Sequence, residues 1–266
     1  MAKILFIGDV IGKPGRKALR EVLPQWKEQY RPDAVVVNVE NIAHGKGVTV
    51  NTLEDIDSLG IDCFTSGNHV FDKGEFSDEA FKKFDKLIRP ANYPAALAGH
   101  GYYRFTRDGQ SYLIINLNGR VFFERAFYGQ LGNPFFMVDQ LIEQQGQKGD
   151  IILVDLHAEA TSEKVAFGWH CDGKVAAVVG THTHVPTADA HVLPKGTAYI
   201  TDVGMTGPVH SVIGVAVEKS MQLFLEQGKF VMEVAEDGPA CVNGVLIETD
   251  GPKAVKIEKL YQEVQS

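Results

Sequence analysis

Five short apolar runs, each followed at once by a side chain that can bind a metal ion, constrain the fold of this chain more than any other feature. Runs of this kind, rich in β-branched residues, are typical of buried strands. They lead into Asp9, Glu40-Asn41, Asn68-His69, His157 and His182-Thr183-His184. Helices are predicted between several of them, which indicates an α/β fold. In open α/β sheets, ligands collect beyond the carboxyl ends of the strands, so these residues are candidates for one shared site.

The chemistry of these side chains favours a site for two metal ions. If the strand ends share one edge, two carboxylates, two amides and four imidazoles converge there. This mixture of ligands, without a thiolate, suits iron, manganese or zinc. Taken singly, each motif has an ordinary explanation, such as a solvated strand end for Glu40-Asn41 or a surface loop for His182-Thr183-His184. The succession of five such strand ends makes a common site the better interpretation.

The tripeptide Gly67-Asn68-His69 combines a metal ligand with a group that exchanges protons. The Asn68 carbonyl oxygen can bind a metal, whereas the His69 imidazole can give or take a proton near neutral pH. Gly67 permits close approach of backbone and ligand. A metal site at His170-Cys171 is not expected, because no partner with ligand spacing accompanies it. Four other histidines are expected at the surface or around the site: His44, His100, His191 and His210.

Composition limits the classes of protein to which the chain can belong. Its 266 residues, 44% of them hydrophobic, suffice for a large buried core, and without a linker or repeat we predict one domain over residues 1–266. The net charge of −8 disfavours binding of long nucleic acids, but it is compatible with a small anionic substrate held by a metal. Three cysteines without CxxC spacing fit buried thiols in a reducing compartment. No apolar stretch approaches the ~18 residues that cross a bilayer, so we expect a cytoplasmic protein without a membrane partner.

The segment around Asp9 is similar to a phosphate-binding loop only at first sight. Three residues separate Gly8 from Gly12-Lys13, and Pro14 replaces the hydroxyl that would hold magnesium. A turn leading into a helix is the better interpretation. Pro24 is expected to kink or divide that helix, because proline has no N–H to donate.

Taken together, the motifs resemble those of the calcineurin-like metallophosphoesterases. Gly8-Asp9, Gly67-Asn68-His69, the lone His157 and Gly180-Thr181-His182-Thr183-His184 occur in the order of that superfamily. The resemblance spans essentially the whole chain, and the motifs as a set are highly specific.

Two positions depart from the wider superfamily and look like its YmdB-like branch. The first motif is usually Asp-x-His, whereas here Ile11 stands two residues after Asp9. The second is usually Gly-Asp-x-x-Asp, whereas here the sequence is Asn38-Val39-Glu40-Asn41. A further segment similar to that branch is Thr201-Asp202-Val203-Gly204-Met205-Thr206-Gly207.

This resemblance implies a four-layer α/β/β/α sandwich with two mixed β-sheets, and it suggests a homo-oligomer. It implies an enzyme with two divalent or mixed-valence metal ions, iron or manganese most often and zinc as an option, that hydrolyses phosphodiesters including 2′,3′-cyclic nucleotides. By position, one ion would be bound by Asp9, Glu40, Asn41 and His184. The other would be bound by Glu40, Asn68, His157 and His182, so that Glu40 bridges the two. His69 would be the proton donor.

The chemistry of such a site gives a mechanism. Two cations ~3.5–4 Å apart can hold a phosphate and lower the pKa of a bound water toward ~7, and the resulting hydroxide attacks phosphorus in line. The leaving alkoxide must then acquire a proton, and His69 is the candidate donor, a role worth roughly 10²–10⁴ in rate. Two alternatives stay open. One is a metal-containing nucleotide-sensing or regulatory module with low turnover, and the other is a phosphomonoesterase.

Overall fold

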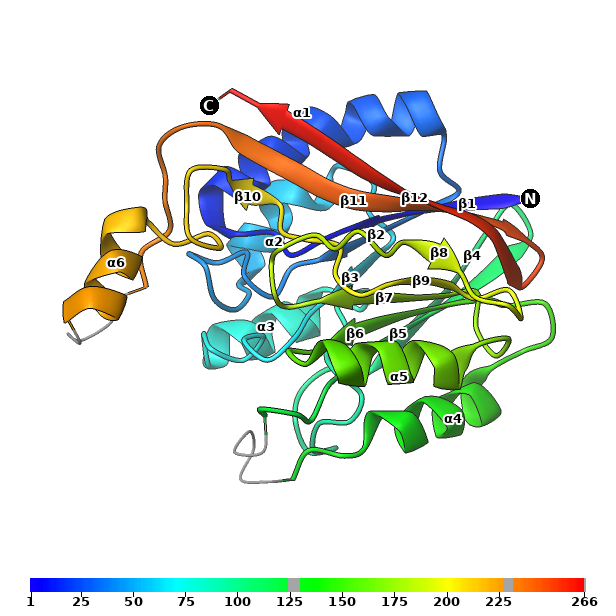
Figure 1. Cartoon of the computed structure of the whole chain (residues 1–266). Coiled ribbons are helices and arrows are strands. Elements are labelled where there is room, and N and C mark those ends of the chain that lie inside the picture. Colours follow the sequence, from blue (N-terminus) through cyan, green and yellow to red (C-terminus); the bar gives the residue numbers. More distant parts are fainter. Residues whose placement is uncertain (124–129, 227–231, 266) are drawn as a thin grey trace.

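The computed structural model describes residues 1–123, 130–226 and 232–265, which form two β-sheets and the helices that cover them (Figure 1). The first sheet contains β1 (Ala2–Ile7), β2 (Ala34–Asn38), β3 (Cys63–Thr65), β10 (Gly207–Pro208), β11 (Ala240–Asp250) and β12 (Lys253–Val264). The second contains β4 (Tyr102–Arg107), β5 (Gln110–Asn118), β6 (Ile151–His157), β7 (Ala177–Thr181), β8 (His191–Val192) and β9 (Ala198–Ile200). The helices are α1 (Gly12–Tyr30), α2 (Val50–Asp57), α3 (Glu75–Lys83), α4 (Pro134–Gln145), α5 (Thr161–Cys171) and α6 (Val217–Glu226).

Both sheets are mixed. In the first, β1, β2 and β3 run parallel, while β11 is antiparallel to β1 and β12 is antiparallel to β11. In the second, β5, β6, β7 and β9 run parallel, and β4 and β8 are antiparallel at the two edges. The prediction of an α/β fold with two mixed sheets is therefore confirmed.

Three separate apolar cores show that the layers are stacked as α/β/β/α. One core packs α1, α2 and α3 against the first sheet, one lies between the sheets, and one packs α4 and α5 against the second sheet. Strand β1 illustrates the alternation, since Leu5 and Ile7 face the helices whereas Ile4 and Phe6 face the other sheet. Successive side chains of a strand point to opposite faces, so a continuously apolar strand can serve two cores.

Capping side chains explain where α2 and α4 begin. Asn133 caps α4 by accepting a hydrogen bond from Phe135 N at 2.9 Å, with Pro134 at the first helical position. Thr49 caps α2 by accepting a hydrogen bond from Thr52 N at 3.3 Å.

Of the two expected effects of Pro24, a kink or a division of the first helix, the division is wrong. Helix α1 continues over 19 residues with Pro24 inside it. Pro24 lies on the exposed face, where water can bind the carbonyl that loses its N–H partner. The buried side chains Leu19, Val22, Leu23 and Trp26 hold both halves of the helix against the sheet.

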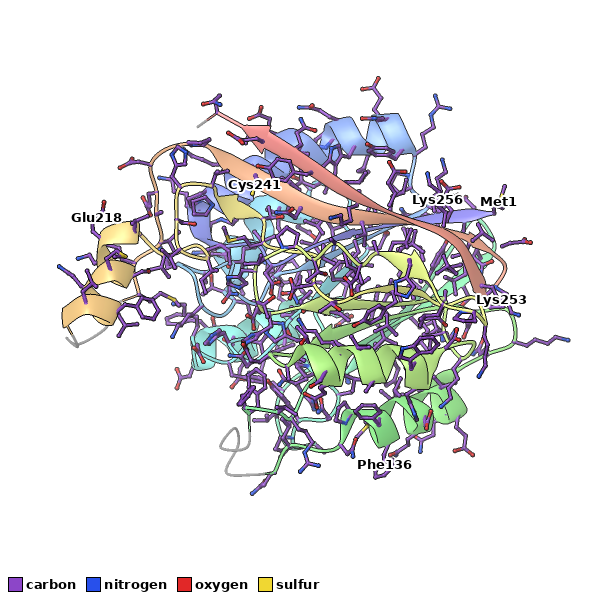
Figure 2. All side chains as sticks on the ribbon, in the orientation of Figure 1. Met1, Phe136, Glu218, Cys241, Lys253 and Lys256 are labelled. Carbon is purple, nitrogen blue, oxygen red and sulfur yellow. The ribbon has the colours of Figure 1, made fainter. Side chains whose placement is uncertain are left out.

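Helix α6 stands apart from the layers. It projects from the body of the molecule, and its Glu218 lies away from the side chains that fill the sandwich (Figures 1 and 2). Over the part of the chain that the structure describes, none of the helices has the length and apolarity needed to cross a membrane. The three cysteines are buried free thiols, as expected.

Candidate metal centre

The ends of β2, β3, β6 and β7 bring the predicted ligands together, and the Nε2 atom of His157 lies at the centre of one group. This atom lies 3.1 Å from Glu40 Oε2, 3.0 Å from Asn68 Oδ1 and 3.0 Å from His182 Nδ1. His157 and Glu40 are buried. Four donor atoms from four chain segments therefore face one another within a space the size of a metal ion's coordination shell.

A second group forms around Asp9, Glu40 and His184, whose potential ligand atoms all lie within 4.8 Å of one another. Asn41 adjoins it, since its Nδ2 donates to Glu40 Oε1 at 2.8 Å and lies 3.1 Å from His184 Nε2. Binding of a metal through the Asn41 oxygen therefore requires rotation of that amide. Glu40 belongs to both groups, as a bridging carboxylate must.

The outer nitrogen of His157 is held by a buried hydroxyl. His157 Nδ1 lies 2.9 Å from Thr181 Oγ1, which donates to Asp155 Oδ1 at 2.8 Å. Since a hydroxyl has one proton to donate, Thr181 accepts from Nδ1–H and directs Nε2 toward Glu40.

The other two histidines are oriented in a similar way. His182 Nε2 lies 3.0 Å from Glu159 Oε2, and His184 Nδ1 lies 2.8 Å from the carbonyl oxygen of Ile213. Metal-binding histidines in proteins almost always have such an acceptor on the nitrogen that does not bind the metal. All three histidines thus aim their other nitrogen at the shared space.

Gly67 makes room for this arrangement. A Cβ atom at position 67 would lie 2.3 Å from His157 Nε2 and 2.4 Å from Glu40 Oε2. Because no side chain fits there, the Asn68 loop can approach the ends of the two sheets. This is the close approach that the sequence predicted.

The charges at the site also fit metal ions. Asp9 is buried and its Oδ1 has no hydrogen-bond partner among the described residues; burial raises the pKa of this carboxyl. Burial also opposes ionisation of Glu40, but the adjacent His157 holds the pKa of Glu40 well below its usual range. An unpartnered buried carboxylate oxygen beside three oriented imidazoles is a donor set that iron, manganese or zinc could satisfy.

His69 lies beside this centre without joining either group. Its backbone N–H donates to Glu40 Oε2 at 3.1 Å, and its ring Nδ1 lies 2.8 Å from Asp72 Oδ2. The His69 side chain is 25% exposed and lines a pocket. Its Nε2 can therefore reach a molecule bound there.

The pocket above the centre has a volume of about 250 Å³. Glu40, His69 and His182 lie on its polar wall. Its apolar wall is formed by Ile11, Ile213, Val215, Met232 and Val234. Ile11, which stands where the superfamily usually has a histidine, thus contributes apolar surface to the pocket.

Several residues around the centre were not predicted. Glu159 and Asp72 lie two and three residues after His157 and His69, but an exposed acid near a histidine is too common to be a signal. The sequence pattern assigns no role to Asp155 or Thr181. Four of the five remaining histidines are exposed, as expected: His44, His100, His191 and His210. His170 contacts Asp139 at 2.9 Å and joins neither of the groups above.

The sandwich and its two groups of ligand atoms define a protein with the metallophosphoesterase fold. A crystal structure of a 5′-nucleotidase precursor from Thermus thermophilus shares this fold, with a TM-score of 0.59 and 13% identity over 99% of this chain and 54% of that chain. At that identity the likeness concerns the fold alone. The chain belongs to the YmdB-like protein family, whose model matches residues 5–260.

Two relatives are similar over nearly their whole length. The 2′,3′-cyclic-nucleotide 2′-phosphodiesterase of Bacillus subtilis is 45% identical over 260 residues, covering 97% of this chain and 96% of the relative. A crystal structure described as a novel phosphatase from Mycoplasma pneumoniae has a TM-score of 0.90 and 38% identity, covering 98% of this chain and 93% of that chain. These relatives confirm the prediction of an enzyme in the phosphoric ester hydrolase class.

Metal affinity should rise with pH. Burial disfavours the charged form of His157, but the carboxylates of Glu40 and Asp9 outweigh it and raise its pKa to about 9. Below that pH, a metal must displace the Nε2 proton, so binding releases about one proton. We expect the affinity for Mn²⁺ to rise by up to about tenfold per unit from pH 6.5 to 8.5, measured by titration of metal-free protein.

A matched control is His100→Gln, which changes an exposed histidine away from the centre and should keep the same pH dependence. An Mn²⁺ affinity that is constant over this range would contradict the assignment of His157 as a ligand.

Proposed function

We propose that this chain is a dinuclear-metal phosphodiesterase that hydrolyses small phosphodiesters, with 2′,3′-cyclic nucleotides as the substrate class. One observation carries the proposal: Glu40 belongs to two groups of potential metal ligands, beside a pocket with a histidine on its wall. The name of the Bacillus subtilis relative supports the choice of substrate.

The ligand sets follow the two groups. We assign one ion to Asp9, Glu40, Asn41 and His184, and the other to Glu40, Asn68, His157 and His182. Iron or manganese fits these ligands best, with zinc as the alternative. When bound, two such ions supply positive charge for a phosphate and lower the pKa of a water molecule toward ~7.

His69 is the proposed proton donor to the leaving oxygen. Asp72 accepts from Nδ1 and orients the ring, so the Nε2 proton is the one available to a molecule in the pocket. The His69 backbone N–H meanwhile donates to the proposed bridging carboxylate of Glu40, which holds the backbone of His69 beside that carboxylate. This geometry favours catalysis over a sensing module, because sensing does not require a proton donor.

The pocket suits a small substrate with one apolar face. Its volume of about 250 Å³ is too small for a long nucleic acid, in keeping with the net charge of −8. The apolar lining residues, among them Ile213 and Val215, share this pocket with Glu40 and His182 and can cover the non-phosphate part of a nucleotide.

The proposed preference for diesters can be tested on the wild-type protein. A phosphomonoesterase is the second candidate, favoured by the description of the Mycoplasma pneumoniae structure as a phosphatase. With added Mn²⁺, we expect faster hydrolysis of bis-nitrophenyl phosphate than of mono-nitrophenyl phosphate, and release of a single monophosphate from 2′,3′-cyclic nucleotides. A faster rate on the monoester would support the second candidate, and no turnover of any substrate would support a sensing module.

Replacement of His69 by alanine should separate the proton donor from the metal ligands. The variant should keep both ions but lose roughly 10²–10⁴ in kcat on a 2′,3′-cyclic nucleotide, whose alkoxide leaving group needs a proton. The loss on bis-nitrophenyl phosphate should be much smaller, because nitrophenolate leaves without one. Asn68→Ala is the matched comparison, and it should lower metal content and reduce both rates alike. An equal loss on both substrates in His69→Ala would argue against the role of His69.

A further inference from the structure

The segment from Thr201 to Gly207 has no role in the reaction proposed above. It lies beside the turn of residues His182, Thr183 and His184, which we call the Thr183 turn. Backbone N–H groups of this segment donate hydrogen bonds to the carbonyl oxygens of three residues in or next to the centre. Val203 N–H donates to Gly180 O at 2.9 Å, Met205 N–H to His184 O at 3.1 Å, and Thr206 N–H to Asp9 O at 2.8 Å. The segment thus connects the end of β7 with Asp9.

Asp202 is the polar centre of this segment, and it is fully buried. Its Oδ2 accepts from Thr183 N at 3.0 Å, from Thr183 Oγ1 at 2.8 Å and from Lys164 Nζ at 2.7 Å. Its Oδ1 accepts from Gly204 N at 2.9 Å. Four donors on one carboxylate fix the position of Thr183, the residue between His182 and His184.

Lys164 reaches this carboxylate from α5 through the interior. Its side chain is 1% exposed, and Nζ also donates to Thr181 O at 2.7 Å. Its stem passes beside Gly180, where a Cβ atom would lie 3.2 Å from Lys164 Cδ and only 1.8 Å from Thr201 O. A buried ammonium is tolerated only with partners, and both of these belong to the framework of the turn.

The turn needs such support because its backbone is strained. His182 has φ 103° and His184 has φ 66°, conformations that residues other than glycine rarely adopt. Strained conformations of this kind persist only where surrounding contacts hold them. The strain also has a consequence for the site, since His182 belongs to one ligand group and His184 to the other.

We propose that Lys164 and Asp202 are positioning residues that hold the Thr183 turn, so that one buried ion pair controls the affinity of both metal sites. The inference rests on the metal-binding part of the proposed function. It predicts a pattern that loss of a single ligand does not give. A variant of His182 or His184 should weaken mainly one ion, whereas a variant of Asp202 should weaken both.

The test is titration of metal-free protein with Mn²⁺ by calorimetry, with the fold checked by circular dichroism and chemical unfolding. Asp202→Asn keeps the shape but faces an amide toward the donors of Lys164 and Thr183. Thr183→Val is a milder variant that removes only the hydroxyl bond, and Thr183→Ser restores it. Asp150→Asn is the matched control. The side chain of Asp150 is 1% exposed and pairs with Arg104 at 2.8 Å, and Asp150 immediately precedes β6, at the end of the strand about 20 Å from His157.

We expect Asp202→Asn to lower the Mn²⁺ affinity of both sites by about 10–100-fold, the usual effect of removing a group that orients metal ligands. Thr183→Val should lower both to a lesser extent, and Thr183→Ser and Asp150→Asn should bind as the wild type does. Wild-type affinity in Asp202→Asn, loss of one ion only, or an equal loss in Asp150→Asn would overturn the inference. Two bound ions without phosphodiester turnover in the wild type would instead contradict the proposed function and leave this inference standing.

Discussion

The buried carboxylate of Glu40 is the group on which the rest of the site depends. It contacts His157 Nε2 at 3.1 Å, accepts from the His69 backbone N–H at 3.1 Å and from Asn41 Nδ2 at 2.8 Å, and is almost inaccessible to water. A buried carboxylate is costly unless charges and donors surround it. Here those partners are the proposed ligands and the proposed proton donor, so the condition that stabilises Glu40 in the fold also assembles the site.

The site belongs to both sheets and forms only where they pack together. Glu40 follows β2 of the first sheet, whereas His157 ends β6 of the second. The sheets are joined directly below the centre, where Asn38 Nδ2 donates to Asp155 Oδ2 at 2.9 Å. The apolar core between the sheets therefore supports the ligand geometry as well as the stability of the fold. Because His157 and Glu40 come from different sheets and meet here, only glycine fits at position 67, where a side chain would collide with both.

The sequence was most informative where local chemistry and strand position agree. The strand ends at Asp9, Glu40, His157 and His182 were predicted from apolar runs followed by polar residues, and the structure brings these side chains together. The four-layer arrangement came from the family resemblance and was confirmed by the three cores. A single domain, a cytoplasmic location and a homo-oligomer stay predictions.

The contacts that orient the ligands could not be predicted, because they join residues far apart in the chain. Lys164 and Asp202 are 38 residues apart, and nothing in their local sequence marks either as buried. A related reason applies to Pro24. Local propensity predicted that it would kink or divide the first helix, whereas packing of Leu23 and Trp26 against the sheet keeps α1 undivided. Tertiary contacts decided each of these cases.

The most direct test of the account is a crystal structure of the wild-type protein grown with Mn²⁺, with the metal positions taken from anomalous diffraction. The account predicts two ions about 3.5–4 Å apart, with one oxygen or both oxygens of Glu40 bound between them. A single ion, or two ions that leave Glu40 free, would contradict it.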